Sequence, residues 1–469
     1  MRIKTDLCVI GAGSGGLSVA AGAVQIGARV VLLEGGRMGG DCLNYGCVPS
    51  KALIAAGKHA HAMKTGAAFG VAPVEPVVDF AKAKDHVHSV IRKIEPHDSV
   101  ERFESLGVRV IQEFGSFISP SEVQAGDTVI EARRFVVATG SSPFVPPIPG
   151  LDSVPYETNE TIFDSRERPE HLLIIGGGPI GMEMAQAHSR LGSKVTVLEG
   201  LKALGRSHPD HAAIVLQQLR SEGITIIEDA MATKIEGEKG AVTITTADEK
   251  VIQGTDLLVA VGRKSNLEKL DLEAAGIERH RTGIKVDASL KTTNRRVYAI
   301  GDVAGAAQFT HVAGYHASVI VKSALFGLPS KARQDHIPSA TYTDPEIAEV
   351  GLTEEAARKK YGGKVEVVSF DYGENDRALA EGLPVGQVRV VVAGSKPVGA
   401  SIVGAQAGEM IHLWSMAIAN GLKMSAFANM IAPYPTLGEA NKRAAGAFFS
   451  KRLFNNPTVE RIVRFVQRF

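Results

Sequence analysis

The sequence has few cysteines, almost no net charge and no long apolar run, and each shortage excludes a class of protein. Three cysteines in 469 residues are too few for a secreted disulfide scaffold, and a four-ligand zinc site would need help from scattered histidines. The 52 basic and 51 acidic residues leave a net charge of +1, which predicts no nucleic-acid partner and no general attraction to an anionic membrane. No apolar run is long enough to span a bilayer, and no signal-peptide pattern follows Met1. We therefore expect a cytoplasmic protein without stable membrane insertion.

Chain length and overall composition indicate a multidomain globular protein. At about 150 residues per domain, the length predicts roughly three domains. The hydrophobic content of 44% and charged content of 22% are typical of globular proteins with a substantial core.

A glycine-rich turn lies between two predicted strands at the start of the chain. Residues 3–10 are apolar, residues 11–16 read GAGSGG and open a predicted helix, and residues 28–33 form a second apolar segment. In this setting Gly11 allows the tight turn, Gly13 lets the backbone approach a pyrophosphate, and Gly16 lets the helix pack on the strand. Glu34, at the end of the second strand, is placed to accept hydrogen bonds from ribose hydroxyls. The segment predicts an adenine dinucleotide site.

The same pattern recurs 165 residues later. A predicted strand at 172–175 leads into a second fingerprint at 176–181, and a strand at 194–198 ends at Glu199. This offset is too long for a solenoid repeat and fits a second nucleotide-binding unit. Each unit closes with an apolar strand and a glycine turn, the first containing Thr139 and Gly140 and the second containing Gly262 and Arg263.

Two cysteines with four residues between them, Cys42 and Cys47, follow the first unit. In a straight helix their Cα atoms would lie roughly 7.5 Å apart along the axis, beyond the roughly 4.4–6.8 Å that a disulfide spans, so a bridge needs irregular backbone at a helix start. Gly46 relaxes the turn, and Pro49 suits the first turn of a helix. The helix N-terminus and Lys51, one turn beyond Cys47, both stabilise a Cys47 thiolate. We interpret the pair as a redox disulfide; a structural disulfide and a zinc site are the alternatives.

The cysteine stretch at 39–51, both glycine fingerprints, residues 138–140 and residues 298–302 together resemble the pyridine nucleotide–disulfide oxidoreductases. These flavoenzymes include dihydrolipoyl dehydrogenase, glutathione reductase and mercuric reductase, and the resemblance covers essentially the whole chain. It implies an α/β fold with two Rossmann-like FAD- and NAD(P)-binding domains plus a C-terminal α+β dimerisation domain, in a homodimer. The implied domains are an FAD-binding domain at 1–145 and 266–338, an NAD(P)-binding domain at 146–265 and a dimerisation domain at 339–469.

The resemblance also implies roles for individual residues. Cys42 would be the interchange thiol that meets the acceptor, and Cys47 the thiol beside the flavin. Lys51 would lie at the reactive flavin edge and pair with Glu183, for which a helix-surface acid is the alternative. No metal ligands are predicted. The implied FAD contacts are Gly11, Gly13, Gly15, Gly16, Glu34, Gly40, Lys51, Thr139, Gly140, Gly301, Asp302, Phe309, Thr310 and His311, and the implied NAD(P)H contacts are Gly176, Gly178, Gly181, Glu199, Gly262 and Arg263.

The preferred nicotinamide nucleotide can be argued from charge. Glu199 favours NADH, because a carboxylate accepts the 2′- and 3′-hydroxyls of the ribose and repels the 2′-phosphate of NADPH. Lys202 and Arg206 follow closely and could bind a phosphate, so NADPH stays possible.

The chain departs from the disulfide reductases at two places. Glutathione reductase and dihydrolipoyl dehydrogenase carry a histidine that the partner subunit supplies to the dithiol, whereas this chain has Tyr434, followed by Glu439. A histidine titrates near 6.5 and a tyrosine near about 10, so Tyr434 is a poor general base at neutral pH. It can donate a hydrogen bond or contact a metal; a structural tyrosine at the dimer interface is the alternative. Asp41, where relatives usually have threonine, adds a negative charge that opposes thiolate formation.

The features together predict an FAD-dependent NAD(P)H:disulfide oxidoreductase, closest to dihydrolipoyl dehydrogenase. It would pass a hydride to FAD and two electrons to the Cys42–Cys47 disulfide, and then reduce a small-molecule or protein-bound disulfide. One alternative is a mercuric-reductase-like enzyme acting on a metal ion or small electrophile; mercuric reductase also has a tyrosine at the position of Tyr434, but this chain lacks its tail cysteine pair. Another alternative is a low-turnover flavin redox sensor or partner protein. Residues 459–469 predict an amphipathic dimer helix, with membrane-surface binding as the lesser alternative.

Overall fold

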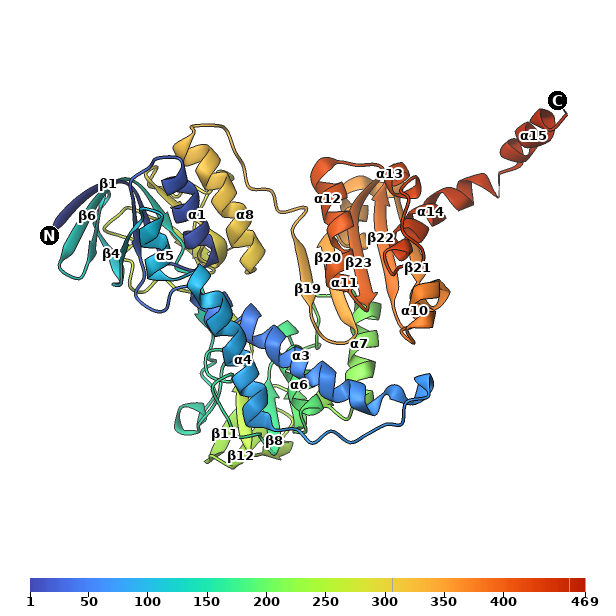
Figure 1. Cartoon of the computed structure of the whole chain (residues 1–469), viewed down its shortest axis with the longest axis horizontal. Coiled ribbons are helices and arrows are strands. Elements are labelled where there is room, and N and C mark those ends of the chain that lie inside the picture. Colours follow the sequence, from blue (N-terminus) through green and yellow to red (C-terminus); the bar gives the residue numbers. More distant parts are fainter. Residues whose placement is uncertain (306, 455, 469) are drawn as a thin grey trace.

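The first layered unit is a seven-stranded sheet with helices on both sides (Figure 1). The computed structural model describes residues 1–305, 307–454 and 456–468. Parallel pairing runs β3-β2-β1-β6, β18 adds to β6 in parallel, and β5 and β4 follow β6 as antiparallel strands. The strands are β1 (Arg2–Ile10), β2 (Val30–Leu33), β3 (Arg109–Ile111), β4 (Gly115–Ser119), β5 (Glu122–Ala125), β6 (Thr128–Val137) and β18 (Val297–Ala299). The helices are α1 (Ser14–Gln25), α2 (Gly40–Asn44), α3 (Cys47–Lys64), α4 (Phe80–Ile94), α5 (Val100–Ser105) and α8 (Thr310–Ile320).

The second unit repeats the parallel arrangement with fewer strands. Its sheet has the order β10-β9-β8-β14, with β8 (His171–Ile175), β9 (Lys194–Leu198), β10 (Thr225–Ile227) and β14 (Asp256–Val259). Helices α6 (Pro179–Arg190) and α7 (Pro209–Ser221) pack on it, and an antiparallel sheet of β11 (Ala232–Glu238), β12 (Ala241–Thr246) and β13 (Val251–Gly254) lies beside it. Two ribbons lie outside these sheets: β7 (Ser141–Pro143) pairs with β15 (Arg263–Ser265), and β16 (Arg279–His280) pairs with β17 (Gly283–Ile284), whose Ile284 packs in the core of the first unit.

The third unit is an antiparallel sheet covered by helices. The strand order is β19-β20-β23-β22-β21, with β19 (Pro338–Thr341), β20 (Glu346–Gly351), β21 (Val365–Asp371), β22 (Gln387–Ala393) and β23 (Lys396–Gly404). Its helices are α9 (Glu354–Tyr361), α10 (Asp376–Ala380), α11 (Ala407–Met410), α12 (His412–Asn420), α13 (Met424–Ala428), α14 (Glu439–Leu453) and α15 (Pro457–Val466). Short 3-10 segments at Gly66–Phe69, Glu95–His97, Leu151–Ser153, Gly301–Ala304, Gly362–Lys364 and Tyr372–Glu374, and a π-helical turn at Val321–Leu325, connect elements of the three units.

The predicted α/β architecture is therefore confirmed, and the units are tied together by helix packing. Helix α3, which starts at Cys47, packs against α6 of the second unit, and their buried residues share one apolar cluster. At Gly57 the two helices come so close that a Cβ would lie 3.3 Å from the Ala187 carbonyl oxygen. This contact fixes the cysteine helix relative to the second fingerprint. The predicted domain boundaries stay a prediction. In the part of the chain that the structure describes, no helix has the length and apolarity to cross a bilayer.

Candidate functional site

The first glycine turn adopts the conformation expected of a dinucleotide cradle. Gly11 has a φ of 105°, and a Cβ there would lie 2.5 Å from the Ala138 carbonyl oxygen. A Cβ on Gly16 would lie 1.8 Å from the Gly11 oxygen, so only glycine permits the contact between α1 and the turn. A Cβ added at Gly13 would come no closer than 3.9 Å to another residue, the Cα of Gly40, so the backbone here is open to a ligand. Glu34 accepts hydrogen bonds from the backbone N–H groups of Ala12 and Gly36, at 2.6 and 2.7 Å.

The second turn repeats this geometry. Gly176 has a φ of 115°, and a Cβ on Gly181 would lie 2.0 Å from the Gly176 oxygen. A Cβ on Gly178 would meet nothing within 4 Å. Glu199 accepts hydrogen bonds from the N–H groups of Gly177 and Leu201, at 2.7 and 2.9 Å. Because the two turns leave the same open backbone at the start of a helix, both fit a pyrophosphate.

One cavity of about 2750 Å³ joins the two turns to the cysteine pair. Its volume and its open glycine backbone fit FAD together with a nicotinamide nucleotide. The predicted site residues that line it are Gly11, Gly13, Gly15, Glu34, Gly40, Cys42, Cys47, Lys51, Thr139, Gly140, Gly176, Gly178, Glu183, Glu199, Gly262, Arg263, Gly301, Asp302, Phe309, Thr310 and His311. Gly16 and Gly181 do not line the cavity. Each allows its helix to pack closely against the preceding glycine turn.

The cysteine pair lies where two helices meet at an angle. Helix α2 ends at Asn44 and α3 begins at Cys47, with Gly46 as its N-cap. A Cβ on Gly46 would lie 2.9 Å from Asp41 Oδ2 and 3.2 Å from the Cα of Cys42, so this close turn requires glycine. The irregular backbone brings the two reduced thiols close enough for each to shift the pKa of the other, which a continuous helix would prevent.

The two thiols differ sharply in acidity. The pKa of Cys47 is lowered to about 6, chiefly by interaction with the Cys42 thiol and then by Thr310 and the charge of Lys51, against the opposing effect of burial. The Cys47 sulfur lies 3.3 Å from Thr310 Oγ1. The pKa of Cys42 is raised, chiefly because it shares its proton with Cys47 and because it is buried. Near neutral pH the pair therefore holds one thiolate, on Cys47, and one proton, on Cys42.

Lys51 forms an ion pair with Glu183 at the same junction. The distance from Lys51 Nζ to Glu183 Oε2 is 2.8 Å, and the Glu183 side chain is only 6% exposed, which excludes the alternative of a helix-surface acid. Glu183 Oε1 also accepts a hydrogen bond from the backbone N–H of Tyr342, at 2.9 Å. The Lys51 ammonium lies 4.4 Å from the centre of the Tyr342 ring. Burial raises the pKa of Tyr342.

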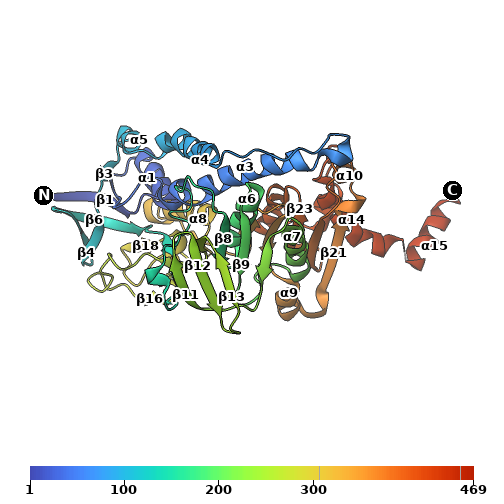
Figure 2. The same cartoon turned by 90° about the horizontal axis from the view of Figure 1, so that it is seen from below.

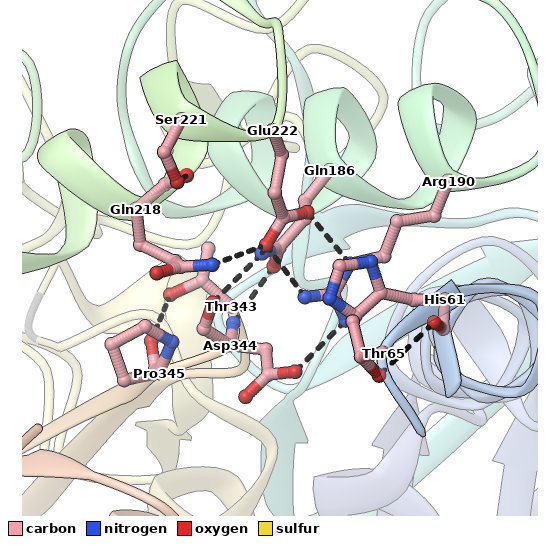
Figure 3. Close-up of polar contacts among 10 residues, drawn as sticks. All are labelled: His61, Thr65, Gln186, Arg190, Gln218, Ser221, Glu222, Thr343, Asp344 and Pro345. Carbon is pink, nitrogen blue, oxygen red and sulfur yellow. Dashed lines mark hydrogen bonds and ion pairs between the residues drawn. The ribbon is translucent and has the colours of Figure 1, made fainter. Parts of the chain in front are cut away.

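The turn after β19, which includes Tyr342 and Asp344, is bound to α6 by a cluster of polar side chains (Figure 3). Gln186 accepts a hydrogen bond from the Asp344 N–H at 2.7 Å and donates to the Asp344 carbonyl at 2.8 Å. Arg190 binds Glu222 through two hydrogen bonds of 2.7 and 2.8 Å and reaches Asp344 Oδ2 at 2.9 Å. Helix α6 therefore links the second fingerprint to the third unit through side chains that the sequence analysis did not single out.

A second polar chain runs from the cysteine stretch to Asp302. Asp41 Oδ1 lies 2.9 Å from Arg263 Nη2 and accepts a 3.1 Å hydrogen bond from Asn159. Arg263 donates to both oxygens of Ser141, and the Ser141 hydroxyl donates to Asp302 at 2.5 Å. Burial raises the pKa of Asp302. The negative charge of Asp41 raises the pKa of both cysteines, as the sequence indicated, but Arg263 neutralises much of it.

Tyr434 and Glu439 do not reach the thiols of their own chain. Neither lines the cavity; Tyr434 is 70% exposed, and its hydroxyl donates to Asp376 at 2.8 Å, which raises its pKa. Glu439 starts α14. Their predicted role at the dithiol therefore requires a second subunit. His311 stacks on Phe309, with ring centres 5.2 Å apart, and contacts the Pro338 carbonyl oxygen at 2.8 Å.

Sequence reasoning missed Ser141, Asn159 and the side-chain roles of Tyr342 and Thr310. Thr310 is predicted as an FAD contact, and the structure also places its hydroxyl 3.3 Å from the Cys47 sulfur. Nothing in the spacing of Tyr342 along the chain indicates that its ring contacts Lys51.

Comparison with known proteins identifies the family. The description "Pyridine nucleotide-disulphide oxidoreductase" matches residues 5–317, and the dimerisation domain of the same family matches residues 337–445, which supports a homodimer. The chain is 34% identical to a mercuric reductase of Lysinibacillus sphaericus over 451 residues, covering 94% of this chain and 82% of the relative. It is also 34% identical to a dihydrolipoyl dehydrogenase of Geobacillus stearothermophilus over 461 residues, covering 94% and 96%.

A solved structure has the same fold over nearly the whole chain. The HOCl-induced flavoprotein disulfide reductase RclA from Escherichia coli superimposes with a TM-score of 0.84 at 28% identity, covering 94% of this chain and 99% of that one. Its Cu(II) complex gives a TM-score of 0.84 at 27% identity, covering 93% and 99%. The chain therefore belongs to the pyridine nucleotide-disulphide oxidoreductase family, whose members bind FAD and a pyridine nucleotide, and is a flavin-dependent oxidoreductase of that class.

Proposed function

We propose that this enzyme transfers a hydride from NADH through FAD to the Cys42–Cys47 disulfide and that the resulting dithiol reduces an acceptor at Cys42. The observation that carries the proposal is the thiol asymmetry, because a low pKa of Cys47 beside the cavity is what a thiol in contact with flavin requires. FAD, when bound, supplies the two-electron relay between nicotinamide and sulfur.

The protein's own residues account for the proton and the charge in this sequence. NADH and the disulfide give NAD⁺, a Cys42 thiol and a Cys47 thiolate, because the transferred hydride supplies both electrons and the proton on Cys42. Lys51 lies where negative charge develops and is held there by Glu183, and the Thr310 hydroxyl donates to the Cys47 thiolate. Cys42 retains the proton and is the thiol left to attack an acceptor. As a disulfide acceptor is reduced, Cys42 forms a mixed disulfide with it, and Cys47 displaces the reduced product.

Anaerobic titration with NADH tests the thiol relay. Two-electron reduction should produce a long-wavelength charge-transfer band and two thiols that react with a thiol reagent. The Cys42→Ser variant should show the band without any reductant at pH 7 or above, because Cys47 can then no longer enter the disulfide. Flavin bleaching with no release of thiols would contradict the proposal.

NADH is the proposed donor because Glu199 is held at the ribose position by two backbone N–H groups. Lys202, which could bind the 2′-phosphate of NADPH, lies 2.6 Å from Asp229 in an ion pair. Steady-state kinetics with both nucleotides should give the higher kcat/KM for NADH. In the Glu199→Ala variant the ratio of kcat/KM for NADH to that for NADPH should fall, because the carboxylate no longer repels the 2′-phosphate. A preference of the unmodified enzyme for NADPH would refute the assignment.

We propose that the acceptor is a disulfide that is reduced to a dithiol, as for dihydrolipoyl dehydrogenase. A thiophilic metal ion is the second candidate. Two observations favour the metal ion: relatives include mercuric reductases, and a structural neighbour was solved as a Cu(II) complex. Tyr434 in place of histidine points the same way, since it cannot serve as a base near neutral pH. NADH oxidation assayed with lipoamide, glutathione disulfide, Hg(II), Cu(II) and a quinone discriminates these acceptors. Negligible turnover with all of them would favour a redox sensor.

A further inference from the structure

Helix α6 lies between α3 and the sheet of the second unit (Figure 2), and one of its faces holds the turn after β19. Glu183, Gln186 and Arg190 are spaced i, i+3 and i+7, so their side chains lie along one face of the helix. Glu183 Oε1 accepts a hydrogen bond from the Tyr342 N–H at 2.9 Å. Gln186 exchanges two hydrogen bonds with the backbone of Asp344, at 2.7 and 2.8 Å, and Arg190 reaches the Asp344 carboxylate at 2.9 Å. Three successive side chains of α6 therefore hold this turn.

The turn places the aromatic ring of Tyr342 against Lys51. The Lys51 ammonium lies 4.4 Å from the centre of the ring and 2.8 Å from Glu183 Oε2. Because Glu183 also binds the Tyr342 N–H, the three residues form a closed loop of contacts. The ring packs against α11 as well, where a Cβ added at Gly408 would lie 3.3 Å from Tyr342 Cε1. The position of the ring is therefore determined both by its backbone and by its neighbours.

The direction of the Lys51 side chain matters because its charge acts on Cys47. The two residues lie four positions apart on α3 and share a face of that helix. The side chain of a lysine is flexible, so its ammonium has a defined position only where other groups hold it. Glu183 supplies a charged partner, and an aromatic ring attracts a cation that lies within about 6 Å of its centre. The groups that act on Cys47 are Cys42 and Asp41 of α2, Lys51 of α3, Thr310 of α8, and Tyr342.

We propose that Tyr342 is a positioning residue, whose ring keeps the Lys51 ammonium beside Cys47 so that the lysine stabilises the thiolate. This role rests on the proposed function and adds a third member to the ion pair of Lys51 and Glu183. It requires the aromatic ring, and a phenylalanine ring would offer a cation the same kind of attraction. Burial raises the pKa of Tyr342, so the phenol stays neutral near pH 7 and leaves Lys51 as the cation beside Cys47.

The charge-transfer band of the two-electron-reduced, FAD-loaded enzyme measures this role when it is titrated with acid. Tyr342→Leu should raise the midpoint from about 6 by roughly half a unit to one unit, because Lys51 then stabilises the Cys47 thiolate less. Flavin reduction by NADH should slow about three- to ten-fold. Tyr342→Phe should keep both values of the unmodified enzyme, since the ring is retained. Tyr342→Met takes the place of Tyr342→Leu if the leucine variant does not retain FAD.

A matched control uses another tyrosine that contacts a lysine. Tyr361, at the end of α9, is 37% exposed against 36% for Tyr342, and Lys360 Nζ lies 5.1 Å from the centre of its ring. This pair is not among the described residues that line the cavity. Tyr361→Leu should therefore change neither the midpoint nor the rate of flavin reduction.

A double-mutant cycle tests whether Tyr342 acts through Lys51. In the Lys51→Met background, Tyr342→Leu should cause no further shift of the midpoint. A shift that persists there would overturn the proposal, because Tyr342 would then act on Cys47 directly. An unshifted midpoint in Tyr342→Leu, or a Tyr342→Phe variant that titrates like Tyr342→Leu, would also overturn it. An unmodified enzyme that forms no band would refute the proposed function and this role with it, whereas a band with an unaltered midpoint would refute only the role of Tyr342.

Discussion

Helices α1 and α6 start from the same glycine turn but carry opposite kinds of side chain. The two fingerprints begin at Gly11 and Gly176, 165 residues apart, so residues of the two helices can be paired at this offset. Positions 18, 21 and 25 of α1 are Ser, Ala and Gln, whereas their counterparts in α6 are Glu183, Gln186 and Arg190. Helix α1 packs through small and apolar residues, while α6 buries polar groups that reach Lys51 and the turn after β19. The backbone turns are alike in the two units, whereas only α6 carries side chains that reach Lys51 and the third unit.

The largest effects should come from the glycines that the two helices share. Gly16→Ala should abolish FAD retention, whereas Gly181→Ala should retain FAD but slow its reduction by NADH roughly 10- to 100-fold or more, because each new Cβ would overlap a backbone oxygen. The flavin-to-protein ratio and stopped-flow reduction measure these outcomes. Gly446→Ala, where a Cβ meets nothing within 4 Å, is the control and should change neither. If Gly181→Ala also lost FAD, the two turns would not act independently.

The next largest effect is expected on stability, from the buried Arg190 of α6. Arg190→Met leaves Glu222 buried without its partner, so we expect a loss of about 3–5 kcal/mol in the free energy of unfolding. Its counterpart Gln25 is exposed, and Gln25→Met should change stability by less than about 0.5 kcal/mol. Urea midpoints followed by Trp414 fluorescence compare the two variants. Similar shifts of the urea midpoint in both variants would mean that the Arg190 contacts of α6 stabilise the protein no more than Gln25 of α1 does.

A smaller effect on rate is expected from the acid of α6. Glu183→Gln removes the charge that holds Lys51 and should slow flavin reduction by NADH roughly 10- to 100-fold, the worth of one charged hydrogen bond. The fold should persist, because the amide can still accept the hydrogen bond from the Tyr342 N–H. Ser18→Ala, at the paired position of α1, should leave the rate unchanged. An unaltered rate in Glu183→Gln would assign the ion pair to structure alone.

The smallest expected effect is on the pKa of Cys47, which Asp41 and its partner Arg263 should shift in opposite directions. The charge-transfer band of the two-electron-reduced enzyme should be full above pH 7 and disappear as the pH falls through about 6, because Cys47 takes up a proton there. Asp41→Asn removes a negative charge and should move this midpoint to lower pH by roughly half a unit to one unit, while Arg263→Gln should move it upward by a similar amount. If both variants titrate like the unmodified enzyme, the ion pair does not tune the thiols.

The sequence predicted local features well. The strand expected at 194–198 coincides with β9, and that expected at 3–10 differs from β1 by one residue, because alternation of buried side chains and the flanking glycines are encoded nearby in the chain. The break at Gly46 followed from disulfide geometry alone.

Contacts between residues far apart in the chain could not be predicted from the sequence. Asp41 and Arg263 stand 222 residues apart, and neither carries a pattern that indicates the other. Arg190 occupies a position near a helix end where arginine is usually solvated, yet its side chain is 4% exposed because α7 and the turn before β20 supply carboxylates.

Because of the strand β18, the cavity can be completed only after most of the chain has been synthesised. It pairs with β6 only after the intervening second unit has been made, and Asp302, whose carboxyl group lines the cavity, follows it directly. Contacts of such high sequence separation form late in folding, because the loop between them must be closed first. A nascent or truncated chain that stops before residue 297 can build the first glycine turn but lacks part of the cavity wall. A completed cavity wall in the first unit thus indicates that the second unit has already been synthesised.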